Sequence, residues 1–110
     1  MLRVGSAGRG ALMVAGLLVV GCAAAVPGKT VASPALQRDV TRLIMTLDRA
    51  SDAGCQERKI MNTEVLSVNR GGGSATERWT VDRCGKPINY LVLLTQSPRG
   101  GTDFRVQLEK

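Results

Sequence analysis

Three cysteines are the residues of this chain whose chemistry is most informative, and the chain has no histidine. Cys55 and Cys84 could pair with each other or help to bind zinc. A structural zinc site needs four ligands, and without histidine the chain is a poor source of them. Histidine is also the base that activates serine and cysteine nucleophiles in familiar hydrolases. Neither a metal, nor a cofactor, nor nucleophilic hydrolysis is therefore expected.

Carboxylate pairs are the remaining source of acid–base chemistry. The candidates Glu64, Glu77, Asp82 and Asp103 are scattered along the chain, and their spacing singles out no two of them. Scattered acids of this kind are usually solvated on a protein surface. The sequence therefore predicts that the protein is not an enzyme.

The first 21 residues have the pattern of a secretory signal peptide. Arg3 and Arg9 precede a segment, 11–20, that carries no charge. Ten apolar residues at about 1.5 Å each cross only about half of a bilayer core of ~30 Å, so a permanent transmembrane helix is poorly supported. Residues 1–21 are therefore predicted to be removed on export, and the remainder is long enough for one domain.

The end of this segment, Val19-Val20-Gly21-Cys22, resembles the lipobox of bacterial lipoproteins. In such proteins the cysteine thiol is joined to diacylglycerol and becomes the new N-terminus. The resemblance implies a lipid anchor at Cys22. Because Ala23 follows it and not aspartate, the resemblance also implies the outer membrane. Residues 23–25 form an A-x-A pattern, a competing site at which ordinary signal peptidase would cut after Ala25 and release a soluble protein.

The two other cysteines are expected to form a disulfide. In an exported protein, three cysteines leave one free thiol after a single disulfide has formed, unless another modification takes one of them. If lipid takes Cys22, Cys55 and Cys84 remain as partners. This bond would join the end of a predicted helix to the end of a predicted central strand.

The folded domain is predicted at 34–110, after a short tether at 22–33. Apolar residues first recur at the helical period, with charged residues on the other side. The apolar stripe consists of Leu36, Val40, Leu43, Ile44 and Leu47. The charged side consists of Arg38, Asp39, Arg42, Asp48 and Arg49. Ser33 suits the N-cap, Pro34 the first helical position and Gly54 the end of the helix.

From Lys59 onward the period changes to that of strands. Met61, Thr63 and Val65 alternate with polar neighbours, and a change of phase at Leu66 predicts a bulge or a strand covered on both faces. The next strands are centred on 77–92. Their inward face is predicted to hold Trp79, Val81, Ile88, Tyr90, Val92 and Leu94.

Turn residues separate the predicted strands. Three glycines at 71–73 favour a hairpin loop over a phosphate loop, because no Gly-Lys-Ser/Thr follows. Cys84 to Pro87 form the next turn, and Ser97-Pro98-Arg99-Gly100 suits a type I turn. Phe104, Val106 and Leu108 alternate in the last strand. The predicted fold is α+β, with one N-terminal amphipathic helix packed on a four-stranded antiparallel meander.

A wider resemblance involves the last third of the chain. Its pattern is similar to that of small, uncharacterised proteobacterial envelope proteins and implies compartment and fold, but no activity. The residues that carry it are Glu77, Trp79, Val81, Cys84-Gly85, Tyr90, Val92 and Gly100-Gly101-Thr102-Asp103-Phe104.

Two functions fit these observations. The first is a lipid-anchored interaction module that binds another envelope protein through Leu91 and Leu93, on the second face of the sheet, or through a sheet edge. The second is an inhibitor of a periplasmic or host hydrolase, with the loop at 70–74 or 97–102 as the inserting element. A helix followed by four strands is also the order of cystatin-like folds, an analogy that favours an inhibitor or binding module. Nucleic acid is not expected as a partner, because the basic residues are scattered and aromatics are few.

The anchor is testable by one substitution. Cys22→Ser removes the only thiol that the lipobox offers, so a soluble or unprocessed product is expected in cell fractionation. A Cys22→Ser protein that is still cleaved and still bound to the membrane would contradict the lipid anchor.

Overall fold

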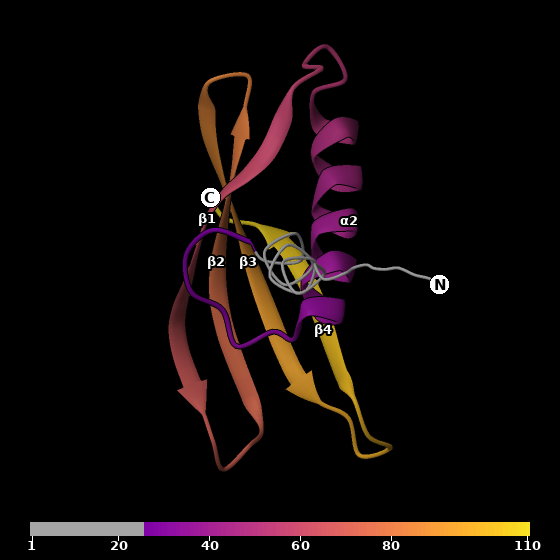
Figure 1. The fold of residues 1–110 in the computed structure, drawn as a ribbon, viewed down its shortest axis with the longest axis vertical. Coiled ribbons are helices and arrows are strands. Elements are labelled where there is room, and N and C mark those ends of the chain that lie inside the picture. Colours follow the sequence, from indigo (N-terminus) through magenta and orange to yellow (C-terminus); the bar gives the residue numbers. More distant parts are fainter. Residues whose placement is uncertain (1–25) are drawn as a thin grey trace, which may run out of the picture.

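The computed structural model describes residues 26–110, which form one helix on one face of a twisted sheet (Figure 1). The strands are antiparallel in the order β1-β2-β3-β4. The predicted α+β meander is confirmed. The elements are α2 (Pro34–Ser51), β1 (Arg58–Asn69), β2 (Ser74–Arg83), β3 (Lys86–Gln96) and β4 (Thr102–Leu108).

The start of α2 is as predicted, and its end is not. Ser33 Oγ accepts a hydrogen bond from the backbone amide of Leu36 at 3.3 Å, and Pro34 follows the cap. The helix ends at Ser51, before the predicted stop at Gly54. Asp52 is the C-cap, and Gly54 only donates its amide to Asp52 Oδ1 at 3.2 Å in the next turn.

The face of α2 that packs on the sheet carries Val40, Ile44 and Asp48, all of them buried. Leu43, assigned to the apolar stripe, is 36% exposed. The prediction that Asp48 lies on the solvent side is wrong. Residues four apart lie on the same face of a helix, so Asp48 continues the row of Val40 and Ile44.

The inner face of the sheet has the predicted core. Trp79 and Tyr90 are opposite one another on β2 and β3, and both are almost fully buried. Val81, Val92 and Leu94 are buried beside them. The aromatic pair is thus part of the packed core.

Strand β1 is irregular in two places. The register with β2 shifts between Ile60 and Asn62 and again between Val65 and Ser67. The second shift confirms the bulge predicted from the phase change at Leu66. The first, at Met61, was not predicted. Both bulges lie on an edge strand, where they discourage pairing with another chain.

The turns follow from local backbone chemistry. Cys84 and Gly85 both have positive φ, 49° and 91°, as a type I′ hairpin turn requires. In the β3–β4 connection the amide of Gly100 donates to the carbonyl of Ser97 at 3.0 Å, which confirms the predicted turn. The Cys84 turn lies at one end of the sheet, and the β1–β2 and β3–β4 turns lie at the other (Figure 1).

Residues 26–33, called the strap here, lie against the domain before α2 begins (Figure 1). The amide of Lys29 donates to the carbonyl of Thr63 at 3.0 Å, and Thr63 Oγ1 donates to the carbonyl of Pro27 at 2.7 Å. Gly28 has a φ of 90°, and a Cβ there would overlap the backbone of Thr63. This part of the expected tether is therefore fitted to the edge of β1, which sequence patterns did not predict.

Cys55 and Cys84 form the predicted disulfide, with their Cα atoms 6.0 Å apart. The bond joins the segment after α2 to the turn between β2 and β3. It therefore holds the helix exit against the sheet.

Loss of this bond should weaken the domain. In the chain-entropy model, a disulfide that closes a loop of 29 residues stabilises a fold by about 3 to 4 kcal/mol. Cys55→Ser/Cys84→Ser should lower the free energy of urea-induced unfolding by about this amount, and Cys22→Ser is the control that leaves the bond intact. Thiol titration that found both Cys55 and Cys84 free in the native protein would rule out this account.

Candidate functional site

The four acids considered for catalysis are held apart by the sheet. Glu64 pairs with Arg78 at 3.0 Å on the face away from α2, and Asp82 Oδ1 accepts the amide of Gly85 at 2.7 Å in the β2–β3 turn. Asp103 is exposed on β4. Glu77 is fully buried, so its prediction as a solvated surface acid is wrong. The register of the sheet brings no two of these four carboxylates together.

Glu77 holds the strap to the core. Its carboxylate accepts hydrogen bonds from Thr30 Oγ1 at 2.7 Å, from the amide of Val31 at 2.8 Å and from Trp79 Nε1 at 2.8 Å. A buried carboxylate is costly unless its oxygens are bonded, and here three donors meet them. The role that this geometry supports for Glu77 is structural.

Asp48 is the centre of a second buried polar cluster. Its carboxylate accepts from Arg58 Nε at 2.9 Å, from Arg83 Nη2 at 2.6 Å and from Tyr90 Oη at 2.7 Å. The three donors come from β1, β2 and β3. One helix residue thus binds three neighbouring strands.

The titration of this cluster is governed by its hydrogen bonds. Burial raises the pKa of Asp48, but the bonds from Arg83, Tyr90 and Arg58 outweigh burial and bring the pKa to about 2. Burial and the bond to Asp48 raise the pKa of Tyr90 to about 12. Neither group exchanges protons near neutral pH, so the cluster is unsuited to general acid–base catalysis.

Metal-binding residues do not gather in residues 26–110. No group of three or more histidine, cysteine, aspartate or glutamate side chains in this part of the chain could hold a metal ion. Cys55 and Cys84 are bonded to each other. No helix among these residues is long and apolar enough to cross a membrane.

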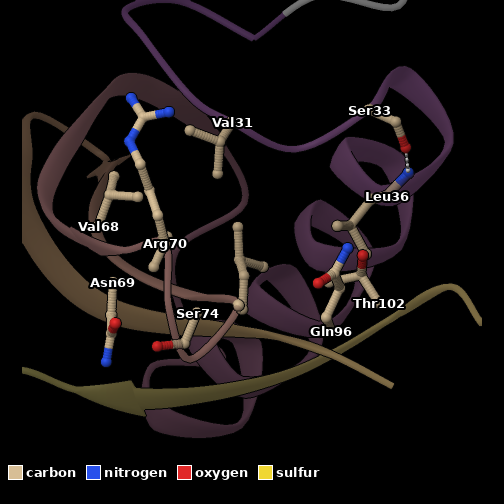
Figure 2. A pocket seen from close by; sticks show the side chains of 12 residues that line it. Val31, Ser33, Leu36, Val68, Asn69, Arg70, Ser74, Gln96 and Thr102 are labelled. Atoms are coloured by element: carbon tan, nitrogen blue, oxygen red, sulfur yellow. Dashed lines mark hydrogen bonds between the residues drawn. The ribbon is translucent and has the colours of Figure 1, made fainter. Parts of the chain in front are cut away.

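A cavity of about 340 Å³ on the inner face is called the end groove here (Figure 2). It lies where the strap, the start of α2 and the ends of all four strands meet. Figure 2 shows Val31, Val68 and Arg70 on one side and Ser33, Leu36, Gln96 and Thr102 on the other. Its apolar lining residues are Val31, Leu36, Val68, Ala75 and Leu94.

Exposed apolar surface distinguishes the end groove from the core. Val31 is 56% exposed and Val68 is 48% exposed, and both line the cavity. Arg70 is the only charged residue of the lining. An apolar groove with one cation at its rim suits an apolar ligand segment with a negative group.

The two loops named as inserting elements lie beside this groove. Residues from 70–74 line it, and Thr102 contributes from the end of 97–102. A meander places alternate turns at the same end of a sheet, so the proximity of these loops was foreseeable. Val31 and Val68 were not foreseen as lining residues, because the strap was expected to be a tether and the phase change at Leu66 predicted either a bulge or a strand covered on both faces.

Leu91 and Leu93 lie on the face away from α2, as predicted, and both are half-buried. A hollow of about 310 Å³ is lined by these leucines together with Thr76, Arg105 and Gln107. Arg78 is opposite Leu91 in register, and its side chain reaches Glu109 at 2.7 Å. The predicted partner face is therefore partly occupied by an ion pair of the domain itself.

Cys22, the lipobox and the alternative cleavage site after Ala25 lie outside the described residues. Comparisons add no assignment: no protein family, no curated protein and no solved structure matches this chain. The resemblances to lipoproteins and to proteobacterial envelope proteins therefore stay predictions from the residues alone.

Removal of the Asp48 charge should destabilise the protein and change its acid response. Because the folded pKa of about 2 lies below the ordinary 3.8, Asp48 stabilises the fold above pH ~4 and loses about 2 kcal/mol as the pH falls toward 2. Asp48→Asn should lack this part of the pH dependence. It should also lower the free energy of unfolding at neutral pH by about 3 to 5 kcal/mol, since two arginines lose their counter-ion.

Asp39→Asn is the matched control, because Asp39 is an acid on the same helix with a side chain that is 57% exposed. Its effect should stay within about 0.5 kcal/mol. Equal effects of the two variants in urea unfolding would show that Asp48 is not a structural tie.

Proposed function

We propose that this protein is a lipid-anchored, non-catalytic interaction module of the cell envelope, and that it binds a partner protein in the end groove. The observation that carries this proposal is the contrast between the two kinds of site. The buried acids Asp48 and Glu77 are fully engaged in structural hydrogen bonds. Val31 and Val68 keep about half of their surface exposed beside an open cavity.

The groove favours an apolar segment of the partner that also carries an acidic residue. Its apolar lining would bury aliphatic or aromatic side chains, and apolar burial is the main source of affinity at the centre of an interface. The Arg70 guanidinium at the rim would pair with a carboxylate. The hydroxyl and amide groups of Ser74 and Gln96 would fix the orientation of the bound segment.

The anchor would place this groove near a membrane. The disulfide is of a kind that persists in oxidising compartments, which supports an exported protein. Val31 is nine positions after Cys22, so a chain at about 3.3 Å per residue limits the distance from anchor to groove to about 30 Å. A partner at or close to the membrane surface fits this limit.

Two alternatives keep specific support. The hollow around Leu91 and Leu93 offers a second docking face, on which both leucines are half-buried. The position of 70–74 and 97–102 at the same end of the sheet supports a hydrolase inhibitor that inserts these loops. Inhibition assays against muramidases and proteases distinguish a hydrolase inhibitor from an interaction module.

Substitution of Val68 tests the groove. Val68→Asp places a charge in the apolar lining at an exposed position, so the fold should persist while crosslinking to one reproducible envelope partner in intact cells falls at least about tenfold. Met61→Asp is the matched control, because Met61 is 46% exposed on the same strand and does not line the groove.

Other outcomes would overturn the proposal. Capture that survives Val68→Asp and disappears with Leu91→Asp/Leu93→Asp would move the site to the second face. Turnover of an envelope polymer by the purified protein would show that the protein is an enzyme.

A further inference from the structure

We infer that β4 pairs, antiparallel, with β4 of a second copy of this chain. This inference does not rest on the proposed function. A sheet with two edges invites pairing unless each edge is blocked, and the two edges here differ. The edge of β1 is interrupted by the bulges at Met61 and Leu66 and is crossed by the strap at Thr63. Within residues 26–110, no comparable bulge or crossing segment is found at β4.

The hydrogen bonds between β3 and β4 show which backbone groups of β4 point outward. The amide of Glu109 donates to the carbonyl of Asn89 at 3.0 Å, and that of Ser97 donates to the carbonyl of Gly101 at 3.0 Å. Bonded and non-bonded pairs alternate along an antiparallel ladder, so odd-numbered residues of β4 bond to β3. The outward amides and carbonyls therefore belong to Thr102, Phe104, Val106 and Leu108.

Charge selects one register for the new pair of strands. If Phe104 lies opposite Phe104 of the second copy, the outward groups of Thr102, Phe104 and Val106 meet their counterparts and form about six hydrogen bonds. In this register Asp103 lies directly opposite Arg105 of the other copy, and the contact occurs twice by symmetry. Both side chains project on the face away from α2, where opposite charges on facing residues stabilise a sheet.

The neighbouring registers are less favourable. A shift that places Arg105 opposite Arg105 of the other copy brings two positive charges together. A shift that centres on Val106 places Asp103 opposite Glu109 and brings two negative charges together. A further shift pairs Arg105 with Glu109, but Glu109 is already bound to Arg78 at 2.7 Å and fewer outward groups would meet. Of these registers, only the one centred on Phe104 places both Asp103 and Arg105 opposite a residue of opposite charge and also pairs most of the outward backbone groups of β4.

Pairing would also continue the apolar face of the sheet. Phe104 and Val106 are half-buried and pack against the core on the side of α2. In the paired strands Phe104 meets its copy, and Thr102 meets Val106. Both copies of α2 would lie on the same face of one continuous sheet.

Charge reversal tests this pairing. The full chain, purified in detergent, should sediment as a dimer at equilibrium. Arg105→Asp places like charges opposite one another twice, so the dimer dissociation constant should rise at least about tenfold. The swap Asp103→Arg/Arg105→Asp restores opposite charges and should return the constant to within about threefold of the original. Arg99→Asp, in the exposed turn before β4, is the matched control and should change nothing.

A covalent test reads the register directly. Asp103→Cys/Arg105→Cys should give disulfide-linked dimers on a non-reducing gel, because facing residues of a non-bonded pair lie about 4.5 Å apart at Cα. Either single substitution should give few. A monomer at all concentrations would overturn the inference, as would a dimer indifferent to Arg105→Asp or one that the charge swap fails to restore.

Discussion

The buried carboxylate of Asp48 is the interaction on which the rest of the structure depends. It joins α2 to β1, β2 and β3 through Arg58, Arg83 and Tyr90. A buried charge without these donors would be strongly destabilising, so the helix can hold only the position in which all three reach it. The disulfide lies at the same end of the domain, because Cys55 precedes β1 and Cys84 follows β2. Two different ties therefore fix this end.

The opposite end of the domain carries the proposed binding surface. There the strap, the start of α2 and the strand ends leave the end groove, and Glu77 positions the strap from within the core. Binding sites are commonly carried by loops on a rigid scaffold, and the ties around Asp48 supply that rigidity. The end groove shares Thr102 with the edge of β4, and the hollow around Leu91 and Leu93 shares Arg105 with that edge, so the three surfaces adjoin one another.

Sequence patterns predicted the elements, the inner face around Trp79 and Tyr90, and the disulfide, because each depends on local period or on cysteine pairing. They failed where a polar residue occupies a core position. Asp48 continues the spacing of Val40 and Ile44, and Glu77 alternates in phase with Trp79, so both positions carried a signal that the residue type concealed. The partners of these acids come from distant segments, and no local pattern encodes them. The strap was missed for the same reason, since its contacts are to Thr63 and Glu77.

Glu77 bonds the strap through the amide of Val31, and Val31 lines the end groove, so the proposed binding site depends on a carboxylate with a structural role. Residue-resolved amide hydrogen exchange on Glu77→Gln tests this claim most directly, because a carboxamide cannot accept from all three donors that Glu77 now binds. In Glu77→Gln the amide of Val31 should lose protection, the amides of β2 and β3 should keep theirs, and partner capture should fall. A Val31 amide that stays protected, or capture that persists after its protection is lost, would contradict the account.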